Sequence, residues 1–381
     1  MRCVPVKLMS LMPSMNIVVT GANGFIGKNL CIMLAESGFD DVVKVDKETT
    51  PDELADCLRN TDFVFHLAGI NRPENDIEFK QGNTDLTAFI ITELEKAGKK
   101  ASIMLSSSTQ AGRDNPYGIS KVEAEQLVNA YGESNGASYY IYRFPNVFGK
   151  WCRPNYNSFV ATFCHNVVND LELTIHDASA SVTLVYIDDV CRALIELLKS
   201  HQPSGYQQIQ PEYPTTVGAV VQTLRAFKSS RVSLVTEDVG TGLTRALYST
   251  YLSYFTPEQF SYTVPDYRDE RGTFCEMLKT KQAGQFSFFT AHPGVTRGGH
   301  YHHSKNEKFL VIKGQAVFRF EQIITKERYE LTVSDDQCQI VETVPGWSHD
   351  ITNIGDDELV VMLWANEIFD RELPDTFASP L

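Results

Sequence analysis

Residues 16–27 read Asn-Ile-Val-Val-Thr-Gly-Ala-Asn-Gly-Phe-Ile-Gly, and this stretch decides the fold of the first part of the chain. Within residues 16–20, all but Asn16 are β-branched, as is typical of a buried strand, and residues 25–36 follow a helical pattern. Glycines between a strand and a helix let the backbone approach a pyrophosphate, to which the helix N-terminus offers N–H groups. We therefore expect a dinucleotide site at Gly21, Asn23, Gly24, Phe25, Ile26 and Gly27.

The segments after the glycine loop continue to alternate between strand and helix patterns. Short apolar strands are expected at 42–45, 63–67, 102–105 and 139–142, and helices at about 84–97 and 119–132. This alternation predicts an α/β fold over residues 15–250, with a parallel, doubly wound sheet of the Rossmann type.

The pattern changes after residue 250. Residues 251–267 are rich in Tyr, Pro, Ser and Thr without a clean period, and we expect a linker there. Strand patterns follow at 285–290, 307–321, 328–333, 338–344 and 358–365, which predicts an all-β domain over residues 268–381, a small antiparallel barrel or jelly roll. Residues 1–14 form an N-terminal extension, in which Pro5 and Pro13 argue against a signal peptide.

Length and composition restrict the compartment and the partners. A chain of 381 residues predicts two domains, and its net charge of −14 disfavours non-specific binding to nucleic acid. Eight cysteines without a Cys-x-x-Cys pair fit a reducing cytoplasm. The sequence has no run of 18 apolar residues. We expect a cytoplasmic protein that binds neither nucleic acid nor membrane.

A tyrosine and a lysine four residues apart follow the fourth expected strand. Tyr117 and Lys121 would share one face of a helix, and a nearby ammonium together with a cofactor's positive ring can depress the phenol pKa. Tyr117 could then act as an acid or base near neutral pH. The serine run at 106–108 could hold a substrate oxygen. By itself this spacing is common, and a solvent-facing pair is the alternative.

The end of the second expected strand leaves the type of nicotinamide cofactor open. Asp46 suits a free ribose 2′-hydroxyl and hence NAD. Lys47 could instead meet the 2′-phosphate of NADP.

A histidine pair in the expected all-β domain has the spacing of metal ligands. Alternation along a strand places His300 and His302 on one face, and Glu307 and His349 can close a cage from neighbouring strands. Three imidazoles and one carboxylate suit Zn, Fe, Mn or Ni. A lone histidine pair usually lies on the surface without a ligand, but four candidate ligands in register favour a divalent metal, for which we choose Zn.

The first domain resembles the extended short-chain dehydrogenase/reductase family, many members of which act on nucleotide-linked sugars. The resemblance implies that Tyr117 is the proton donor or acceptor, that Lys121 orients the cofactor, and that Asn83 completes the set. It also implies Asp62 near the adenine and Leu67, Ala68 and Gly69 along the cofactor. Ser108 is our choice of catalytic serine, with Ser107 and Thr109 as alternatives. The matching stretches are Thr20–Gly27, Asp62–Gly69, Asn83, the serine run, Tyr117 with Lys121, Arg143–Gly149 and Tyr186–Val190.

Residues that follow the Arg143 stretch are candidates for holding a sugar-nucleotide diphosphate. They are Asn146 and, in the loop at 150–158, Arg153, Asn155 and Tyr156. An ordered surface loop without a ligand is an equally weighted interpretation of this segment.

The second domain resembles the cupins, in which a Gly-x5-His-x-His-x4-Glu pattern such as the one from Gly294 to Glu307 holds a metal. The stretches around Arg271 and Arg297 also resemble metal-free cupin epimerases of deoxysugar pathways. That alternative implies His300 as a general base and Arg297 near the substrate. The additional His302 and Glu307 favour the metal.

Further matching stretches lie at Leu105–Ser108, Asp114–Gly118, Phe148–Cys152 and Asn306–Leu310. With them, the chain over residues 15–381 resembles the bifunctional capsular polysaccharide-assembling reductases of the CapF type. The resemblance implies a UDP-linked 2-acetamido-2,6-dideoxy-4-ketohexose as substrate. The cupin would epimerise C3 and the reductase would reduce C4 with NADPH, giving UDP-N-acetyl-6-deoxy-talosamine, a precursor of UDP-N-acetyl-L-fucosamine for capsule or O-antigen. It tips the cofactor choice to NADP(H) over NAD, and we expect a homo-oligomer, a dimer or tetramer. The alternatives are an NAD-dependent sugar-nucleotide 4-epimerase or dehydratase with a structural cupin, and a scaffold with a dead site.

Overall fold

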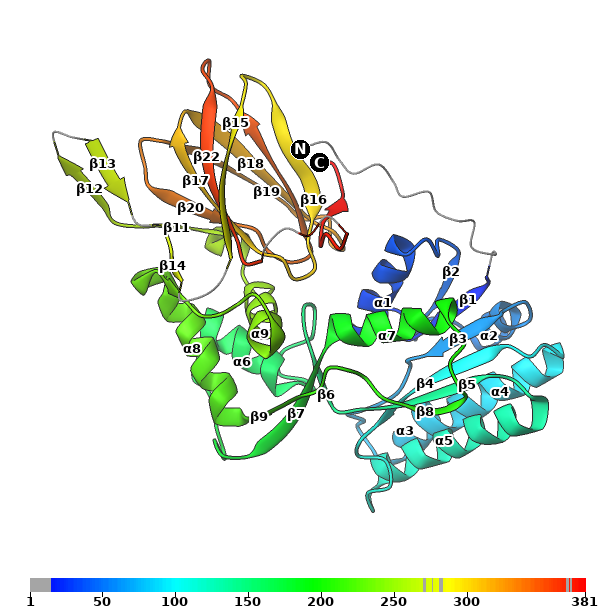
Figure 1. Ribbon diagram of the computed structural model, residues 1–381. Coiled ribbons are helices and arrows are strands. Elements are labelled where there is room, and N and C mark those ends of the chain that lie inside the picture. Colours follow the sequence, from blue (N-terminus) through cyan, green and yellow to red (C-terminus); the bar gives the residue numbers. More distant parts are fainter. Residues whose placement is uncertain (1–14, 270–271, 276, 281–283, 368–369, 371) are drawn as a thin grey trace. The chain divides into compact units, whose positions relative to one another are not determined.

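A computed structural model describes residues 15–269, 272–275, 277–280, 284–367, 370 and 372–381 (Figure 1). The expected extension at residues 1–14 lies outside the described residues. Arg271 also lies outside them, so the stretch around it is described only in part. The chain forms two compact units. The first unit contains the described residues of Met1–Val147 together with Thr183–Glu212, and the second contains Phe148–Val182 and the described residues of Tyr213–Leu381.

The first unit is built on a six-stranded parallel sheet, as the alternation of strand and helix patterns predicts. The strand order is β2-β1-β3-β4-β5-β8. The strands are β1 Ile17–Thr20, β2 Val42–Val45, β3 Phe63–His66, β4 Ser102–Ser108, β5 Tyr139–Phe144 and β8 Gly205–Gln207. All their pairings are parallel, so the carboxyl ends of the strands meet at one edge of the sheet. The expectation of a Rossmann-type sheet is confirmed.

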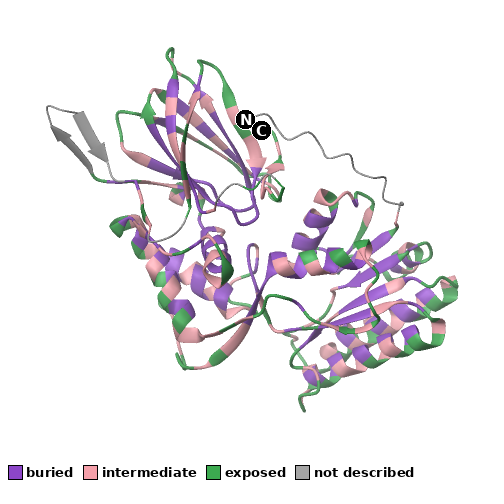
Figure 2. Ribbon diagram, viewed as in Figure 1, coloured by how far each residue is buried: buried purple, intermediate pink, exposed green. Residues whose placement is uncertain are grey.

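Helices cover both faces of this sheet, which is why β1 and β3 are buried along their whole length (Figures 1 and 2). On one face, apolar residues of α2, α4 and α5 form a common core with the strands, including Leu58, Ile90 and Val128. Helices α1 and α7 pack together on the other face. The helices are α1 Phe25–Glu36, α2 Pro51–Leu58, α3 Ile77–Phe79, the π-helix η1 Lys80–Asp85, α4 Leu86–Ala97, α5 Pro116–Asn135 and α7 Ile187–Lys199.

The second unit contains three helices that pack on one another and a region made only of strands. The helices are α6 Phe159–Val168, α8 Val217–Ser233 and α9 Gly242–Leu252, followed by the short 3-10 helix η2 Pro257–Gln259. Strand β10 Val235–Thr236 pairs with β14 Lys279–Thr280. A small three-stranded sheet, whose strands do not all belong to this unit, consists of β6 Asn146–Phe148, β7 Ser181–Tyr186 and β9 Tyr213–Thr216.

The strand region consists of two five-stranded antiparallel sheets whose inner faces meet, so the expected all-β domain is confirmed. The rings of Phe309 and Phe318, one from each sheet, lie 5.8 Å apart. One sheet has the order β11-β20-β17-β22-β15 and the other β19-β18-β21-β16-β23. The strands are β11 Ser261–Thr263, β15 Gln285–Ala291, β16 Thr296–Tyr301, β17 Glu307–Lys313, β18 Gln315–Gln322, β19 Arg328–Ser334, β20 Gln339–Glu342, β21 Trp347–Asn353, β22 Leu359–Ala365 and β23 Phe377–Ala378; β12 Asp266–Asp269 and β13 Gly272–Cys275 form a separate hairpin.

Two details of the second unit differ from the sequence patterns. The expected strand at 307–321 is a hairpin, because Gly314 turns the chain with φ of +93° between β17 and β18. The expected linker at 251–267 is packed into the unit instead. Phe260 is fully buried, and residues 261–263 pair with β20 at the edge of a sheet, because the aromatic residues of this segment have an apolar surface to cover. The two units accordingly do not separate at residue 250.

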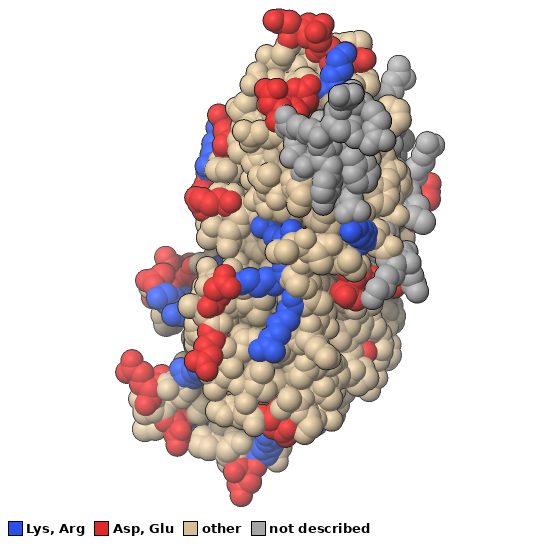
Figure 3. Space-filling model, turned by 90° about the vertical axis from the view of Figure 1, so that its left-hand side faces the viewer, with Lys and Arg blue, Asp and Glu red and all other residues tan. Residues whose placement is uncertain are grey.

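Acidic and basic side chains are interspersed on the face of the molecule shown in Figure 3. Among the described residues, none of the helices combines the length and the apolar character that crossing a membrane requires.

Candidate functional site

The glycine loop joins β1 to α1 at the carboxyl edge of the parallel sheet, where its glycines are needed for steric reasons. Gly21 has φ of +68°, and a Cβ there would lie 2.8 Å from the backbone N of Ala68. A Cβ on Gly27 would lie 2.2 Å from the carbonyl oxygen of Gly21. No described side chain caps α1 at Gly24, so its first N–H groups are available to a ligand.

Two further loops at this edge adjoin the glycine loop. Residues 67–69 follow β3, and a Cβ on Gly69 would lie 3.1 Å from Nζ of Lys121. Asp46, after β2, accepts hydrogen bonds from the side chain of Asn23 and, at 2.9 Å, from the backbone N–H of Glu48. The neighbouring Lys47 side chain is 89% exposed. The edge therefore brings together most of the residues that the sequence predicts for the cofactor.

Asp62 is an exception, because it lies at the opposite edge of the sheet. It precedes β3, and its carboxylate accepts the backbone N–H of Asn16 at 2.8 Å. In the parallel register of β1 and β3, Thr20 lies opposite His66, so Asp62 is at the amino edge of the sheet, whereas the glycine loop is at the carboxyl edge. A dinucleotide that lies along the carboxyl edge does not reach it.

Helix α5 presents Tyr117 and Lys121 on one face. The helix begins sharply because the Asn115 side chain accepts the Gly118 N–H at 2.8 Å and Pro116 occupies its first turn. Lys121 Nζ lies 5.9 Å from the centre of the Tyr117 ring and donates to the Ser106 carbonyl at 3.1 Å. Burial lowers the pKa of Lys121 to about 8, although Glu125 opposes the shift. Burial raises the pKa of Tyr117, against the expected depression.

The serine run at the end of β4 divides its hydroxyls between two partners. Ser107 donates to the buried carboxylate of Glu125, while Ser108 hydrogen-bonds with Tyr117. Arg143 also binds Glu125 through two hydrogen bonds, at 2.9 and 2.6 Å. Of the serines considered, the structure brings Ser108 to Tyr117. Glu125 was not predicted as a site residue from the sequence. Its spacing of four residues from Lys121, which places both on the same helical face, is a signal that could have indicated it.

Asn83 lies in the π-helix η1, a type of segment that is often found at functional sites. Its amide donates to Ser120 Oγ at 3.0 Å and to the Ile70 carbonyl at 3.2 Å, and accepts the Ile70 N–H at 3.0 Å. The side chain is 2% exposed. Asn83 therefore fixes the loop after Gly69 against helix α5.

The second unit brings the four predicted metal ligands together between its two sheets. His300 lies in β16, His302 just after it, Glu307 at the start of β17 and His349 in β21. One ligand atom from each lies within 4.8 Å of the others. Nε2 of His302 and Nε2 of His349 lie 3.2 and 3.4 Å from the same oxygen of Glu307. These atoms converge on one point, as a coordinated ion requires.

The ionisation of these groups fits a divalent cation. Burial, together with His349 and His302, lowers the pKa of His300 to about 3, so the ring is neutral at pH 7. Burial opposes ionisation of Glu307, but the neighbouring histidines hold its pKa well below the usual range. The other Glu307 oxygen binds Lys305 at 2.9 Å. Neutral imidazoles and an ionised carboxylate are the forms that bind metal. Lys305 had no sequence signal beyond its proximity to Glu307.

A β-bulge determines which side chains of β16 accompany the cluster. In the pairing of β16 with β21, Arg297 lies opposite Ile351 and His300 lies opposite His349. Arg297 and His300 are three residues apart in β16, whereas Ile351 and His349 are only two residues apart in β21. The extra residue is Gly299, since Gly298 pairs with Asp350, and both glycines have positive φ. Arg297 therefore shares the inner face with His300, where its guanidinium lies 5.0 Å from the centre of the Phe289 ring.

The residues predicted to hold the diphosphate do not form a buried cluster. In the loop before α6, Arg153 is exposed, and its guanidinium lies 5.5 Å from the centre of the Tyr156 ring. Asn155 adopts φ of +55°, and its N–H donates to Thr162 Oγ1 at 2.9 Å. Asn146 belongs to the first unit and donates to the Thr183 carbonyl at 3.3 Å.

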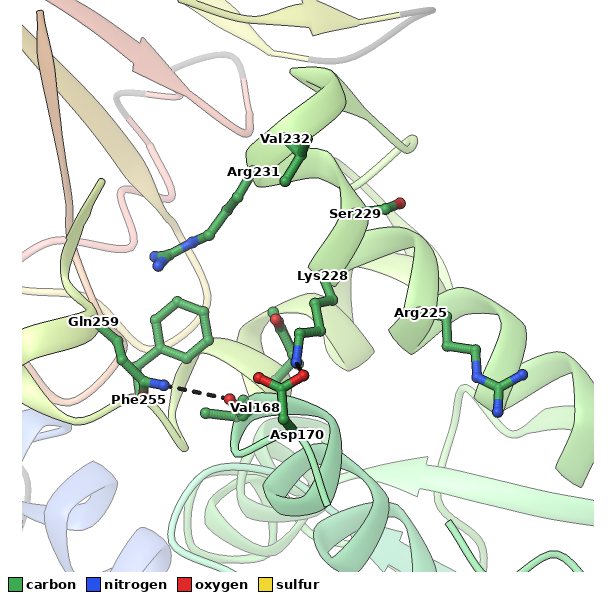
Figure 4. Close-up of a pocket in the computed structure, with 10 residues that line it drawn as sticks. Val168, Asp170, Arg225, Lys228, Ser229, Arg231, Val232, Phe255 and Gln259 are labelled. Carbon is green, nitrogen blue, oxygen red and sulfur yellow. Dashed lines mark hydrogen bonds and ion pairs between the residues drawn. The ribbon is translucent and has the colours of Figure 1, made fainter. Parts of the chain in front are cut away.

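A cavity of about 480 Å³ in the second unit lies apart from the predicted sites (Figure 4). Among the described residues that line it are Lys228, Arg231 and Phe255, and none of the lining residues is a predicted site residue. Lys228 pairs with Asp170, and Arg231 pairs with Glu342. Two of the three cationic side chains that line the cavity, Arg225 being the third, are therefore neutralised, and we assign no ligand to the cavity.

Comparisons with known proteins match two parts of the chain to two families. Residues 17–209 match the NAD dependent epimerase/dehydratase family, and residues 267–377 match the polysaccharide biosynthesis C-terminal domain. The chain is 55% identical over 365 residues to the UDP-2-acetamido-2,6-beta-L-arabino-hexul-4-ose reductase of Pseudomonas aeruginosa, covering 96% of this chain and 98% of the relative. It is 42% identical to the crystal structure of the capsular polysaccharide assembling protein CapF from Staphylococcus aureus, with a TM-score of 0.67, covering 96% and 100% of the two chains.

Proposed function

This chain belongs to the NAD dependent epimerase/dehydratase family as a member of the CapF type, and from that premise we propose that it is a bifunctional UDP-sugar enzyme. The proposed substrate is a UDP-linked 2-acetamido-2,6-dideoxy-4-ketohexose. The second unit epimerises C3, and the first unit reduces C4 with NADPH. The product is UDP-N-acetyl-6-deoxy-talosamine, for capsule or O-antigen synthesis.

The observation that carries the reductase proposal is the cluster of Ser108, Tyr117 and Lys121 beside Gly69. A reduced nicotinamide, when bound, would supply the hydride for C4. The phenol of Tyr117 gives its proton to O4, so that the ketone becomes an alcohol. The Ser108 hydroxyl holds the ketone oxygen, and the Lys121 ammonium favours the phenolate that remains.

Geometry after β2 supports NADPH over NADH. Both oxygens of Asp46 already accept hydrogen bonds from the chain, from Asn23 and from the Glu48 N–H. The Lys47 ammonium is exposed, and its ion pair with Glu48, at 3.4 Å, is on the surface. Lys47 can therefore turn to a 2′-phosphate at little cost.

The strand region is proposed to be a cupin jelly roll that holds a divalent metal, with Zn as the first choice, through His300, His302, Glu307 and His349. Such an ion, when bound, would supply Lewis-acid stabilisation of a ketone oxygen. Arg297 lies on the same inner face, which supports a role in binding an anionic part of the substrate.

The order of the two steps follows from carbonyl chemistry. The C4 ketone makes the C3 proton acidic, so epimerisation has to precede reduction. A base removes this proton, and a proton returns on the opposite face of C3, so the atoms balance. His300 is the first candidate for the base if the site works without metal.

The proposal is tested by incubating the full chain with the 4-keto substrate and NADPH in D₂O and reading the product by NMR. Deuterium at C3 and an alcohol at C4 are expected, above the exchange seen without enzyme. Tyr117→Phe should retain C3 deuteration and lose reduction, whereas His300→Ala should lose C3 deuteration. Reduction of C4 without C3 deuteration in the wild type would leave the second unit with a structural role and refute the two-step function.

A further inference from the structure

The C-terminal segment of the chain holds one of the four clustered histidines. Nδ1 of His302 lies 2.5 Å from the backbone carbonyl oxygen of Asp375, 73 residues later in the chain. A carbonyl can only accept, so Nδ1 carries the hydrogen, and in the neutral ring Nε2 keeps its lone pair. Nε2 is the atom that points at Glu307. This contact fixes the tautomer that a metal ligand requires.

The carboxylate of the same residue binds the backbone that follows His302. Oδ1 of Asp375 accepts the His303 N–H at 2.9 Å. Oδ2 accepts the N–H groups of Ser304 and Lys305, each at 2.7 Å, and the Ser304 hydroxyl at 3.0 Å. The Asp375 side chain is 14% exposed, so water competes little with these charge-assisted bonds. They fix the turn between His302 and Glu307.

The segment that carries Asp375 is itself anchored next to the cluster. Strand β23 pairs with β16 so that Ala378 lies opposite His300, and the ring of Phe377 lies 5.5 Å from that of Tyr301. The Ser379 N–H donates to the Gly299 carbonyl at 2.8 Å. Asp375 is thus held by the strand that supplies the first histidine.

Helix α9 binds the same turn from another direction. Arg245 donates to the Ser304 hydroxyl and pairs with Glu367 at 3.0 Å. The Ser249 hydroxyl donates to the Ser304 carbonyl at 2.9 Å. The turn therefore has few alternative conformations once Asp375 is in place.

We propose that Asp375 is a positioning residue of the metal centre, which orients His302 through its carbonyl and holds the turn to Glu307 through its carboxylate. This inference rests on the metal site of the proposed function. Loss of such a supporting group typically costs 10–100-fold in metal affinity. Asp375→Ala should weaken Zn binding by that factor, and Asp375→Asn, which keeps one acceptor oxygen, by less.

The test uses the full-length protein, stripped of metal and titrated with Zn against a competing chromophoric chelator. Co²⁺ is titrated in parallel, because its visible absorption reports ligand geometry independently of activity. Asp370→Ala is the matched control, since this carboxylate lies on the same segment but is exposed and bonds only the Glu372 N–H among the contacts described. NADPH binding and circular dichroism check that each variant is folded.

A Zn affinity at least 10-fold weaker in Asp375→Ala, with an altered Co²⁺ spectrum and an unchanged control, would support the proposal. Wild-type affinity and an identical spectrum would overturn it while leaving the metal site intact. A wild-type chain that binds neither ion would overturn the metal site and this inference together. If Asp375→Ala does not fold, the same two criteria are applied to Asp375→Asn.

Discussion

Replacing Lys121 by methionine should change the stability of the first unit in a pH-dependent manner. Lys121 is 6% exposed, and burial lowers its pKa from the ordinary 10.5 to about 8. At neutral pH the side chain is charged in both the folded and the unfolded chain. The folded state therefore bears the cost of holding an ammonium away from water.

The size of the effect follows from linkage. The difference between 10.5 and about 8, at 1.36 kcal/mol for each pKa unit, is about 3 kcal/mol. Below pH 8 this cost is fully present. As the pH rises from 8 to 10.5 the folded state releases its proton before the unfolded state does, so the cost disappears and the wild type gains stability. The variant does not titrate at this position, so its free energy of unfolding lacks this gain.

The assay is urea unfolding of the two proteins without cofactor between pH 7 and pH 10.5, followed by far-ultraviolet circular dichroism. All three tryptophans, Trp151, Trp347 and Trp364, belong to the second unit, so their fluorescence follows that unit separately. Titration of other groups cancels in the difference between the proteins. The wild type should gain about 3 kcal/mol on the variant over this range. A difference that stays constant with pH would refute the burial argument for Lys121.

Three further outcomes are expected. Tyr117→Phe should lower kcat for C4 reduction by roughly 10²–10⁴-fold with little change in NADPH affinity, measured by stopped flow and fluorescence titration, because it removes the proton donor and leaves the glycine loop intact. Lys47→Ala should weaken NADPH binding by roughly 10-fold and leave NADH binding unchanged, with the exposed Lys44→Ala as control; equal losses for both cofactors would exclude a 2′-phosphate contact. Glu342→Gln should destabilise the second unit by about 3–5 kcal/mol in urea, because it leaves Lys308, only 3% exposed, without the carboxylate that neutralises it, whereas loss of less than about 1 kcal/mol would show that the charge is solvated.

Features that depend on neighbours in the chain could be predicted from the sequence. The strand, glycine loop and helix at residues 16–36 are specified locally, since only glycine tolerates the backbone of residue 21 and the close contact at residue 27. The spacing of Tyr117 and Lys121 follows from the period of a helix. The two domain types follow from strand and helix periodicity, and the structure confirms them.

Side-chain roles that depend on distant partners could not be predicted. Ser107 and Ser108 are equivalent in sequence, and only the position of Glu125 in α5 commits Ser107 to a different hydrogen bond. Arg297 joins the face of His300 because a bulge changes the alternation of β16. Periodicity contains no information about either arrangement.

The sequence by itself determined the sheet, the nucleotide loop and the identity of the residues that can carry the chemistry, because short-range backbone geometry specifies them. Tertiary structure alone decided which edge of the sheet each residue occupies, which separates Asp62 from the glycine loop, and which distant segment holds His302. Asp375 reaches His302 across 73 residues through strand pairing at the end of the chain. Such contacts form only when packed strands bring remote backbone groups together, and their location depends on the whole fold.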